Sequence, residues 1–97
     1  MANTTVSATA TVGVLLAANP RRMRAVFDNS FSGSDDARIG TLATLTFAKG
    51  IFLEAGDVIE DEMDPADPTY YYRGAWYVIC DTGNTASVSV QEDEVPN

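Results

Sequence analysis

The stretch Val6-Ser-Ala-Thr-Ala-Thr-Val-Gly-Val14 alternates strictly between two kinds of residue. Valine and alanine occupy the even positions from 6 to 14, whereas serine, threonine and glycine occupy the odd positions. Period-two alternation with β-branched residues is typical of a strand that buries one face and exposes the other. The sequence therefore predicts a strand over residues 6–14, with Val6, Ala8, Ala10, Val12 and Val14 facing the core.

Further short segments with this β-type pattern follow, and turn-forming residues separate them. Asn19-Pro20 ends the apolar stretch after the first strand, because proline removes a backbone donor and restricts the residue before it. Later turns are marked by glycine, asparagine, serine and proline at close intervals. The expected strands are Arg24–Asp28, Ala37–Leu42, Ala43–Phe47, Ile51–Leu53, Tyr70–Asp81 and Ala86–Gln91.

This succession of short strands predicts an all-β protein. About seven strands suit a single antiparallel β-sandwich or jelly roll that occupies residues 1–97. No window shows the sustained three-four spacing of an amphipathic helix, although a short helix at 42–47 or 10–18 is the alternative. Residues 1–5 form an uncharged extended arm, which we expect to pair with the edge of another chain.

The composition argues against several classes of function. Histidine is absent, and the single cysteine, Cys80, lies in an apolar segment without a neighbouring base. These two facts disfavour acid–base, nucleophilic and zinc chemistry. Fourteen acidic against six basic residues give a net charge of -8, which repels nucleic acid and anionic lipid. We therefore expect a protein that is not an enzyme, needs no cofactor, and binds neither nucleic acid nor membrane.

Residues 75–80, A-W-Y-V-I-C, place apolar side chains on both faces of the expected strand. One face enters the core of a small sandwich, so the other must be covered by the loop at 54–69 or by another chain. The tyrosines at 70–72 extend this apolar surface, and rings with a polar tip suit an interface. The candidate interface anchors are Tyr70, Tyr71, Tyr72 and Trp76.

Basic and acidic residues are segregated along the chain. Five of the six basic residues precede position 50, against three acids, whereas eleven acids follow it with only Arg73. This asymmetry suits contacts in which the basic patch of one copy meets an acidic surface of another copy or of a larger assembly. The alternative is an acidic surface that simply keeps the protein soluble. The basic residues expected at such a contact are Arg21, Arg22 and Arg24.

The most acidic stretch, E-D-E-M-D-P-A-D at residues 60–67, offers carboxylate oxygens of the kind that calcium prefers. It lacks the spacing and the glycine of an EF-hand loop. The alternative is a solvated loop whose negative charge discourages sheet edges from pairing. Asp61, Asp64 and Asp67 recur every three residues and are the weak candidates for a metal site.

Several segments resemble small virion proteins of tailed bacteriophages. These proteins resemble one another in an Asn-Pro-Arg turn that opens a strand, a Gly-Ile-x-Leu-x-x-Gly stretch and a closing strand of small residues. The corresponding segments here are LLAANPRR at 15–22, FDNS at 27–30, GIFLEAGD at 50–57 and YVICDTGNTASVSVQE at 77–92.

This resemblance implies a non-enzymatic β-sandwich that binds a protein shell. The implied function is that of a capsid decoration protein, with the major capsid protein or other virion proteins as partners and a homo-oligomer, for example a trimer, as the working unit. A head-fibre, connector or tail component is an alternative within the virion, and a carbohydrate- or calcium-binding β-module is an alternative of another class. Because residues 1–20 lack the basic region of a signal peptide, we expect synthesis in the host cytoplasm before incorporation into the virion.

Overall fold

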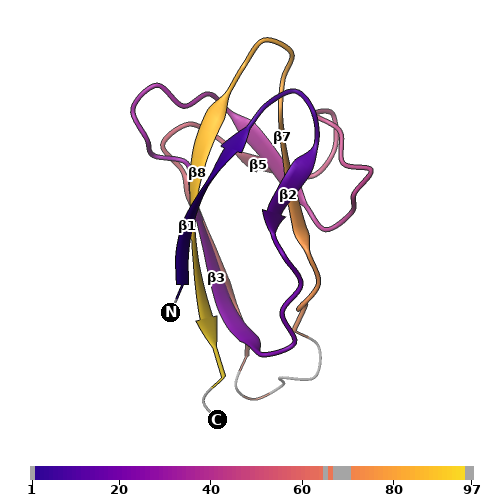
Figure 1. The fold of residues 1–97 in the computed structure, drawn as a ribbon, viewed down its shortest axis with the longest axis vertical. Coiled ribbons are helices and arrows are strands. Elements are labelled where there is room, and N and C mark those ends of the chain that lie inside the picture. The colour runs from indigo at the N-terminus through magenta and orange to yellow at the C-terminus, as the bar shows by residue number, and fades with distance from the viewer. Residues whose placement is uncertain (1, 65, 67–70, 96–97) are drawn as a thin grey trace.

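The computed structural model describes residues 2–64, 66 and 71–95 (Figure 1). Eight strands form within these residues, in two antiparallel sheets of four that pack together as a sandwich. The strands are β1 (Ala2–Ala8), β2 (Gly13–Leu16), β3 (Arg22–Asp28), β4 (Ala37–Gly40), β5 (Ile51–Leu53), β6 (Val58–Glu62), β7 (Trp76–Cys80) and β8 (Ala86–Glu94). Sheet A has the order β1-β8-β3-β6, and sheet B has the order β2-β7-β4-β5. The all-β sandwich that the sequence predicts is confirmed.

The strand expected over residues 6–14 is instead divided between the two sheets. β1 ends at Ala8 in sheet A, and the chain then turns through 9–12 into β2 of sheet B, along the arc that joins the two strands in Figure 1. The carbonyl of Thr9 accepts a hydrogen bond of 2.8 Å from the amide of Cys80, which belongs to sheet B. A tertiary contact therefore breaks the strand at a point where the alternation of alanine and threonine continues unchanged.

The turn also shifts the alternation of buried and exposed side chains by one residue. Ala8 is buried and Val6 packs against the core, as expected. Beyond the turn, however, Leu15 is buried whereas Val14 is 55% exposed. Ala10 is exposed as well. The expected core positions are thus correct in the first half of the segment and wrong in the second.

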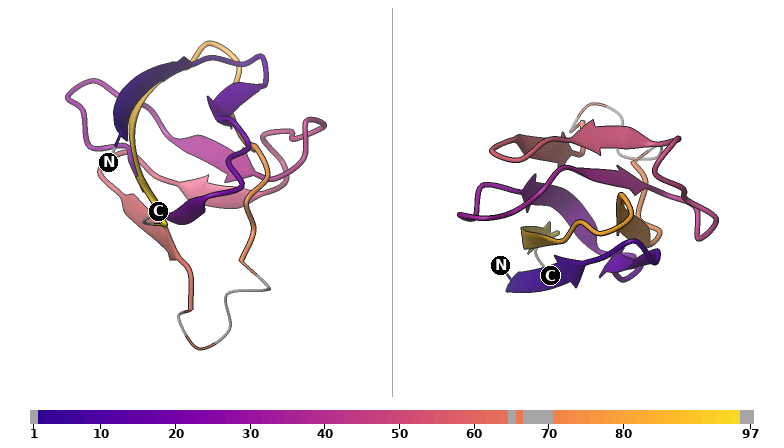
Figure 2. Two further views of the ribbon diagram at one scale, coloured as in Figure 1. Left: turned by 60° about the horizontal axis from the view of Figure 1, so that its bottom comes forward. Right: turned by 90° about the horizontal axis from the view of Figure 1, so that it is seen from above.

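Residues 2–5 do not form a free arm but belong to strand β1 of sheet A. Ala2 to Thr5 pair with β8 of the same chain, with Ala2 opposite Glu92 and Thr5 opposite Ser89. β1 and β8 lie side by side in both views of Figure 2. The segment is extended, as predicted, but one of its two edges pairs with the interior strand β8 of its own chain. Met1 lies outside the described residues.

Residues 43–47 form turns and not the strand, or the alternative helix, that the sequence suggests. The amide of Leu45 donates to the carbonyl of Leu42 at 3.1 Å, and the Leu45 side chain is buried. Leu45 packs closely against Gly40, where an added Cβ would lie 3.0 Å from its Cδ1 atom. A local apolar anchor therefore holds this segment as a loop between β4 and β5.

The acidic segment expected as a loop contains strand β6. Its pairing with β3 places Glu62 opposite Arg24 and Ile59 opposite Phe27. Opposite charges across a strand pair offset the low strand preference of acidic residues. Residues 54–57 form a tight turn from sheet B into sheet A, in which the amide of Asp57 donates to the carbonyl of Glu54 at 2.9 Å. The described part of the expected 54–69 loop therefore connects sheet B to sheet A and continues into β6. The residues next to the outer side of β7 are those of the neighbouring strands of sheet B.

The core lies between the two sheets and is centred on two aromatic rings. The ring centroids of Phe27 in sheet A and Trp76 in sheet B are 5.1 Å apart. Trp76 is 6% exposed and Phe27 is fully buried. One contiguous cluster joins the sheets, and its other buried members are Ala8, Leu15, Ala25, Ala37, Ile39, Leu53, Val78, Cys80, Ala86, Val88 and Val90.

Candidate functional site

Arg22 is part of the protein interior and not of a basic surface. Its side chain has no exposed area, and its Nε atom donates to Glu92 Oε2 at 2.8 Å. Its terminal nitrogens donate to the carbonyls of Gly74 at 3.0 Å and Ala17 at 2.7 Å. A buried guanidinium is tolerated only with such partners, because removing an ion from water costs several kcal/mol. Arg22 therefore connects β3 to β8, to the segment between β2 and β3, and to the segment that precedes β7.

Arg21 and Arg24 also find partners within the chain. Arg24 forms ion pairs with Glu60 at 3.2 Å and with Asp93 at 3.1 Å. The hydrogen bond from Arg24 lowers the pKa of the Glu60 carboxyl below its usual range. Arg21 donates to the carbonyl of Val95. The sequence predicts these arginines at a contact with another copy. In the structure they form ion pairs and hydrogen bonds with β6, with β8 and with the residue that follows β8.

Tyr71 is anchored to strand β6 of sheet A. Its hydroxyl donates to the carbonyl of Asp61 at 3.1 Å, and the Arg73 guanidinium lies 5.2 Å from its ring centroid. Burial, with a smaller contribution from the Asp61 carboxylate, raises the pKa of Tyr71 to about 12. These contacts fix the ring against the chain itself.

Tyr72 and Trp76 form an edge-to-face aromatic pair, with ring centroids 5.9 Å apart. The Tyr72 hydroxyl donates to the carbonyl of Ala75 at 2.7 Å, while 38% of the residue stays exposed. Trp76 is a core residue, so it is not available as the surface anchor that the sequence suggests. Tyr70 lies outside the described residues.

The two described acidic candidates for a metal site lie in different parts of the chain: one in a strand and one in the segment that follows it. Asp61 lies on β6, and Asp64 accepts a hydrogen bond of 2.9 Å from the amide of Ala66. Asp67 lies outside the described residues. Within the described ranges, no three histidine, cysteine, aspartate or glutamate side chains are grouped so that they could hold a metal ion.

The outer face of sheet B carries the second apolar side of β7. Ile79 lies opposite Arg38 of β4, and Arg38 in turn lies opposite Phe52 of β5. The Arg38 guanidinium is 4.4 Å from the ring centroid of Phe52 and 5.6 Å from that of Phe47. Ile79 is buried although it lies outside the main core cluster. Arg38, in contact with two aromatic rings, thus lies beside Ile79 on the second apolar side of β7.

We call the outward-facing residues Val14, Tyr77, Ile79, Arg38 and Phe52 the sheet B face. Val14 at one end is 55% exposed, and Phe52 at the other is 38% exposed. Residues 37–53 contain two basic side chains and no acidic one. Part of this surface could have been recognised from the sequence, because the alternation in A-R-I-G at 37–40 places Arg38 on the face opposite Ala37 and Ile39.

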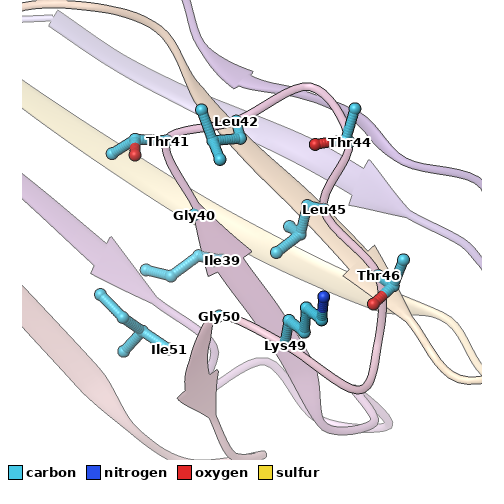
Figure 3. A pocket seen from close by; sticks show the side chains of 10 residues that line it. All are labelled: Ile39, Gly40, Thr41, Leu42, Thr44, Leu45, Thr46, Lys49, Gly50 and Ile51. Atoms are coloured by element: carbon cyan, nitrogen blue, oxygen red, sulfur yellow. The ribbon is translucent and has the colours of Figure 1, made fainter.

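A pocket of about 500 Å³ opens beneath the loop that joins β4 and β5 (Figure 3). Its lining includes the apolar residues Ile39, Leu45 and Ile51 and the polar residues Thr46 and Lys49. In Figure 3 the Leu45 side chain points from the loop toward Gly40. None of its described lining residues carries a carboxylate, an imidazole or a thiol. The pocket therefore adds a concave, largely apolar surface to an acid-free part of the protein.

The outer face of sheet A is polar and uncharged along β1 and the adjoining part of β8. Three outward residues of β1 lie opposite three outward residues of β8, in the pairs Asn3 with Gln91, Thr5 with Ser89, and Ser7 with Ser87. Neither residues 2–8 nor residues 86–91 include a charged side chain. The sheet B face thus carries aromatic and basic side chains, whereas the part of the outer face of sheet A formed by β1 and residues 86–91 carries hydroxyl and amide groups.

The described residues contain no helix long and apolar enough to cross a membrane. No protein-family model, curated protein or solved structure matches the chain.

Proposed function

We propose that this protein is a non-enzymatic structural subunit of a tailed-phage virion, most simply a capsid decoration protein that binds the outer shell through the sheet B face. The observation that carries the proposal is the exposure of Val14 and Phe52 on either side of Arg38. Exposed apolar surface of this kind, bordered by polar groups, marks contact with another macromolecule. The resemblance of the sequence to small virion proteins supports the shell as that macromolecule.

The chemistry of the sheet B face specifies the surface that it would contact. Arg38 is held in place by its hydrogen bond to the carbonyl of Phe47 at 3.1 Å and by the ring of Phe52. A cation that is already ordered loses little freedom on binding. The complementary shell surface is therefore apolar and carries acidic groups that meet Arg38 and Lys49. Individually weak contacts of this kind gain strength when a shell presents many copies of the same site and the subunits are linked as oligomers.

Particle composition tests the proposal directly. Virus particles are purified from cultures that carry the gene, and the chain is quantified by mass spectrometry relative to the major capsid protein. We expect the chain in the purified particles in a fixed ratio to the shell protein. Its recovery only from the soluble fraction would overturn the proposal, and its presence in purified tails without heads would support the alternative of a tail component.

A binding measurement then tests the sheet B face. Phe52→Ser removes an exposed aromatic side chain from the face, and Val58→Ser is the matched control because Val58 is 56% exposed on β6 of the other sheet. An anchor side chain at an interface centre often contributes 2 kcal/mol or more, so Phe52→Ser should weaken binding to shells lacking the protein by at least about tenfold. Equal binding by the two variants would exclude this face as the contact.

A further inference from the structure

Strand β1 lies at one edge of sheet A, and its outer edge has no partner among the described residues. An edge strand presents backbone donors and acceptors that another chain can pair with, and proteins usually protect such edges. The common protections are short length, charged side chains, proline and bulges. β1 is seven residues long, consists of A-N-T-T-V-S-A, and pairs with β8 from Ala2 to Ala8 without a shift in register. It has none of these protections.

The other three edges of the described sheets are each protected. β6 is V-I-E-D-E, so two copies that paired there would bring carboxylates together. β5 has only three residues. β2 has four residues, and its pairing with β7 shifts register between Val14 and Leu16. The unprotected edge of β1 is therefore an exception within this molecule.

The distribution of charge indicates what pairs with β1. The net charge is -8, so two copies repel one another over most of their surfaces. The seven residues of β1 and residues 86–91 of the adjacent β8 carry no charged side chain. A second copy therefore meets the least repulsion along this edge. The polar side chains of Asn3, Thr5 and Ser7 on the outer face keep the unpaired edge compatible with water.

We propose that β1 pairs with β1 of a second copy, antiparallel about a two-fold axis at Thr5, to form a continuous eight-stranded sheet. In the register that overlaps both strands fully, Ala2 lies opposite Ala8 of the second copy and Thr5 lies opposite its own counterpart. The same segment serves both partners, as a two-fold interface requires. This pairing uses sheet A and leaves the sheet B face free, so it does not depend on the proposed shell contact.

Cross-linking tests the register. Opposed residues of an antiparallel pair have Cβ atoms about 4.5–5.5 Å apart, within reach of a disulfide or a short bismaleimide linker. Thr5→Cys should therefore form covalent dimers on oxidation or with the linker, whereas Val58→Cys on the edge strand β6 should form few. Cys80 is 1% exposed, and burial raises the pKa of its thiol, so it should not react in either variant. Cross-linking of the two variants to the same extent would overturn the proposal.

Sedimentation equilibrium over a range of concentrations tests the pairing itself, without any shell. We expect a monomer–dimer equilibrium for the unaltered protein. Thr5→Glu places two carboxylates opposite one another at the axis and should raise the dissociation constant of the dimer roughly fivefold. Gln91→Glu adds the same charge to the same face one strand further in, and should change the constant little. A protein that is monomeric at every concentration, or two variants that dissociate equally, would show that β1 does not form this interface.

Discussion

The Nε atom of Arg22 lies 2.8 Å from the Oε2 atom of Glu92, and the Arg22 side chain is entirely buried. This ion pair joins strands that are far apart along the chain, because β3 lies between β6 and β8 in sheet A. The basic first half and the acidic second half of the sequence are therefore brought together within one sheet. Arg22 and Arg24, two of the three arginines expected at a contact between copies, thus form ion pairs with acidic residues of the second half inside a single copy.

Replacing Arg22 with alanine should lower the free energy of unfolding by about 3–5 kcal/mol, because Glu92 and the carbonyls of Ala17 and Gly74 would lose their partner. Urea denaturation near pH 7 measures this change. Arg21→Gln is the matched control, since Arg21 is exposed and its loss should change stability by about 0.5 kcal/mol or less. If the two variants are equally stable, the buried ion pair does not stabilise the fold.

Trp76→Ala should destabilise the protein by about 3–5 kcal/mol, because it removes the ring that packs against Phe27 at the centre of the core. Thermal unfolding followed by circular dichroism measures the loss. Tyr72→Phe keeps the aromatic contact with Trp76 and removes only a hydroxyl, so it should lower stability by about 1 kcal/mol. A Trp76→Ala protein that unfolds like the unaltered one would support the surface role predicted from the sequence.

Stability should depend on the ionisation of Tyr71 at high pH. The fold raises its pKa from the ordinary 10.0 to about 12, so the folded protein favours the neutral phenol. The stabilisation is therefore complete below pH 10 and is lost as the pH rises from 10 towards 12. Ultraviolet titration of tyrosine should lose its component near pH 12 in Tyr71→Phe and keep it in Tyr72→Phe. If Tyr71→Phe instead removes a component near pH 10, the ring is not shielded from water.

Gly50→Ala should destabilise the loop beside the pocket. Gly50 has a φ of +103°, and an added Cβ would lie 2.6 Å from Leu45 Cδ1 and 2.8 Å from the carbonyl oxygen of Ile39. Strain of this kind costs about 1–3 kcal/mol, which chemical denaturation can measure. Gly13→Ala is the control, because nothing lies within 4 Å of a Cβ at that position. Equal stability of the two variants would mean that the loop adjusts freely.

The fold class could be predicted because period-two alternation is a local property of the sequence. The position at which the chain changes sheets could not, because the turn at Thr9 depends on its hydrogen bond with Cys80, far along the chain. β6 was missed for a related reason, since its acidic residues are compatible with a strand only beside Arg24.

The candidate interface could be predicted only in part. Both faces of β7 are apolar, so the sequence shows that the strand has two covered sides but not which one enters the core. Pairing with β4 determines which side of β7 enters the core, since it places Val78 opposite Ile39 and Ile79 opposite Arg38. Trp76 then lies on the inner side with Val78, and the exposed positions are found on the neighbouring strands. Their identity depends on register, which alternation alone does not encode.

Strand β8 occupies an interior position in sheet A although it comes after the other seven described strands along the chain. β3 can pair with β6 earlier, but Val6 lacks its cross-strand partner Val88 and Phe27 lacks its partner Val90 until β8 has left the ribosome. During translation, sheet A can therefore form the β3–β6 pair, but it can join β1 to the other strands only after β8 emerges. A nascent chain held at β7 should remain sensitive to protease, and full protection should arrive with the emergence of β8 from the exit tunnel.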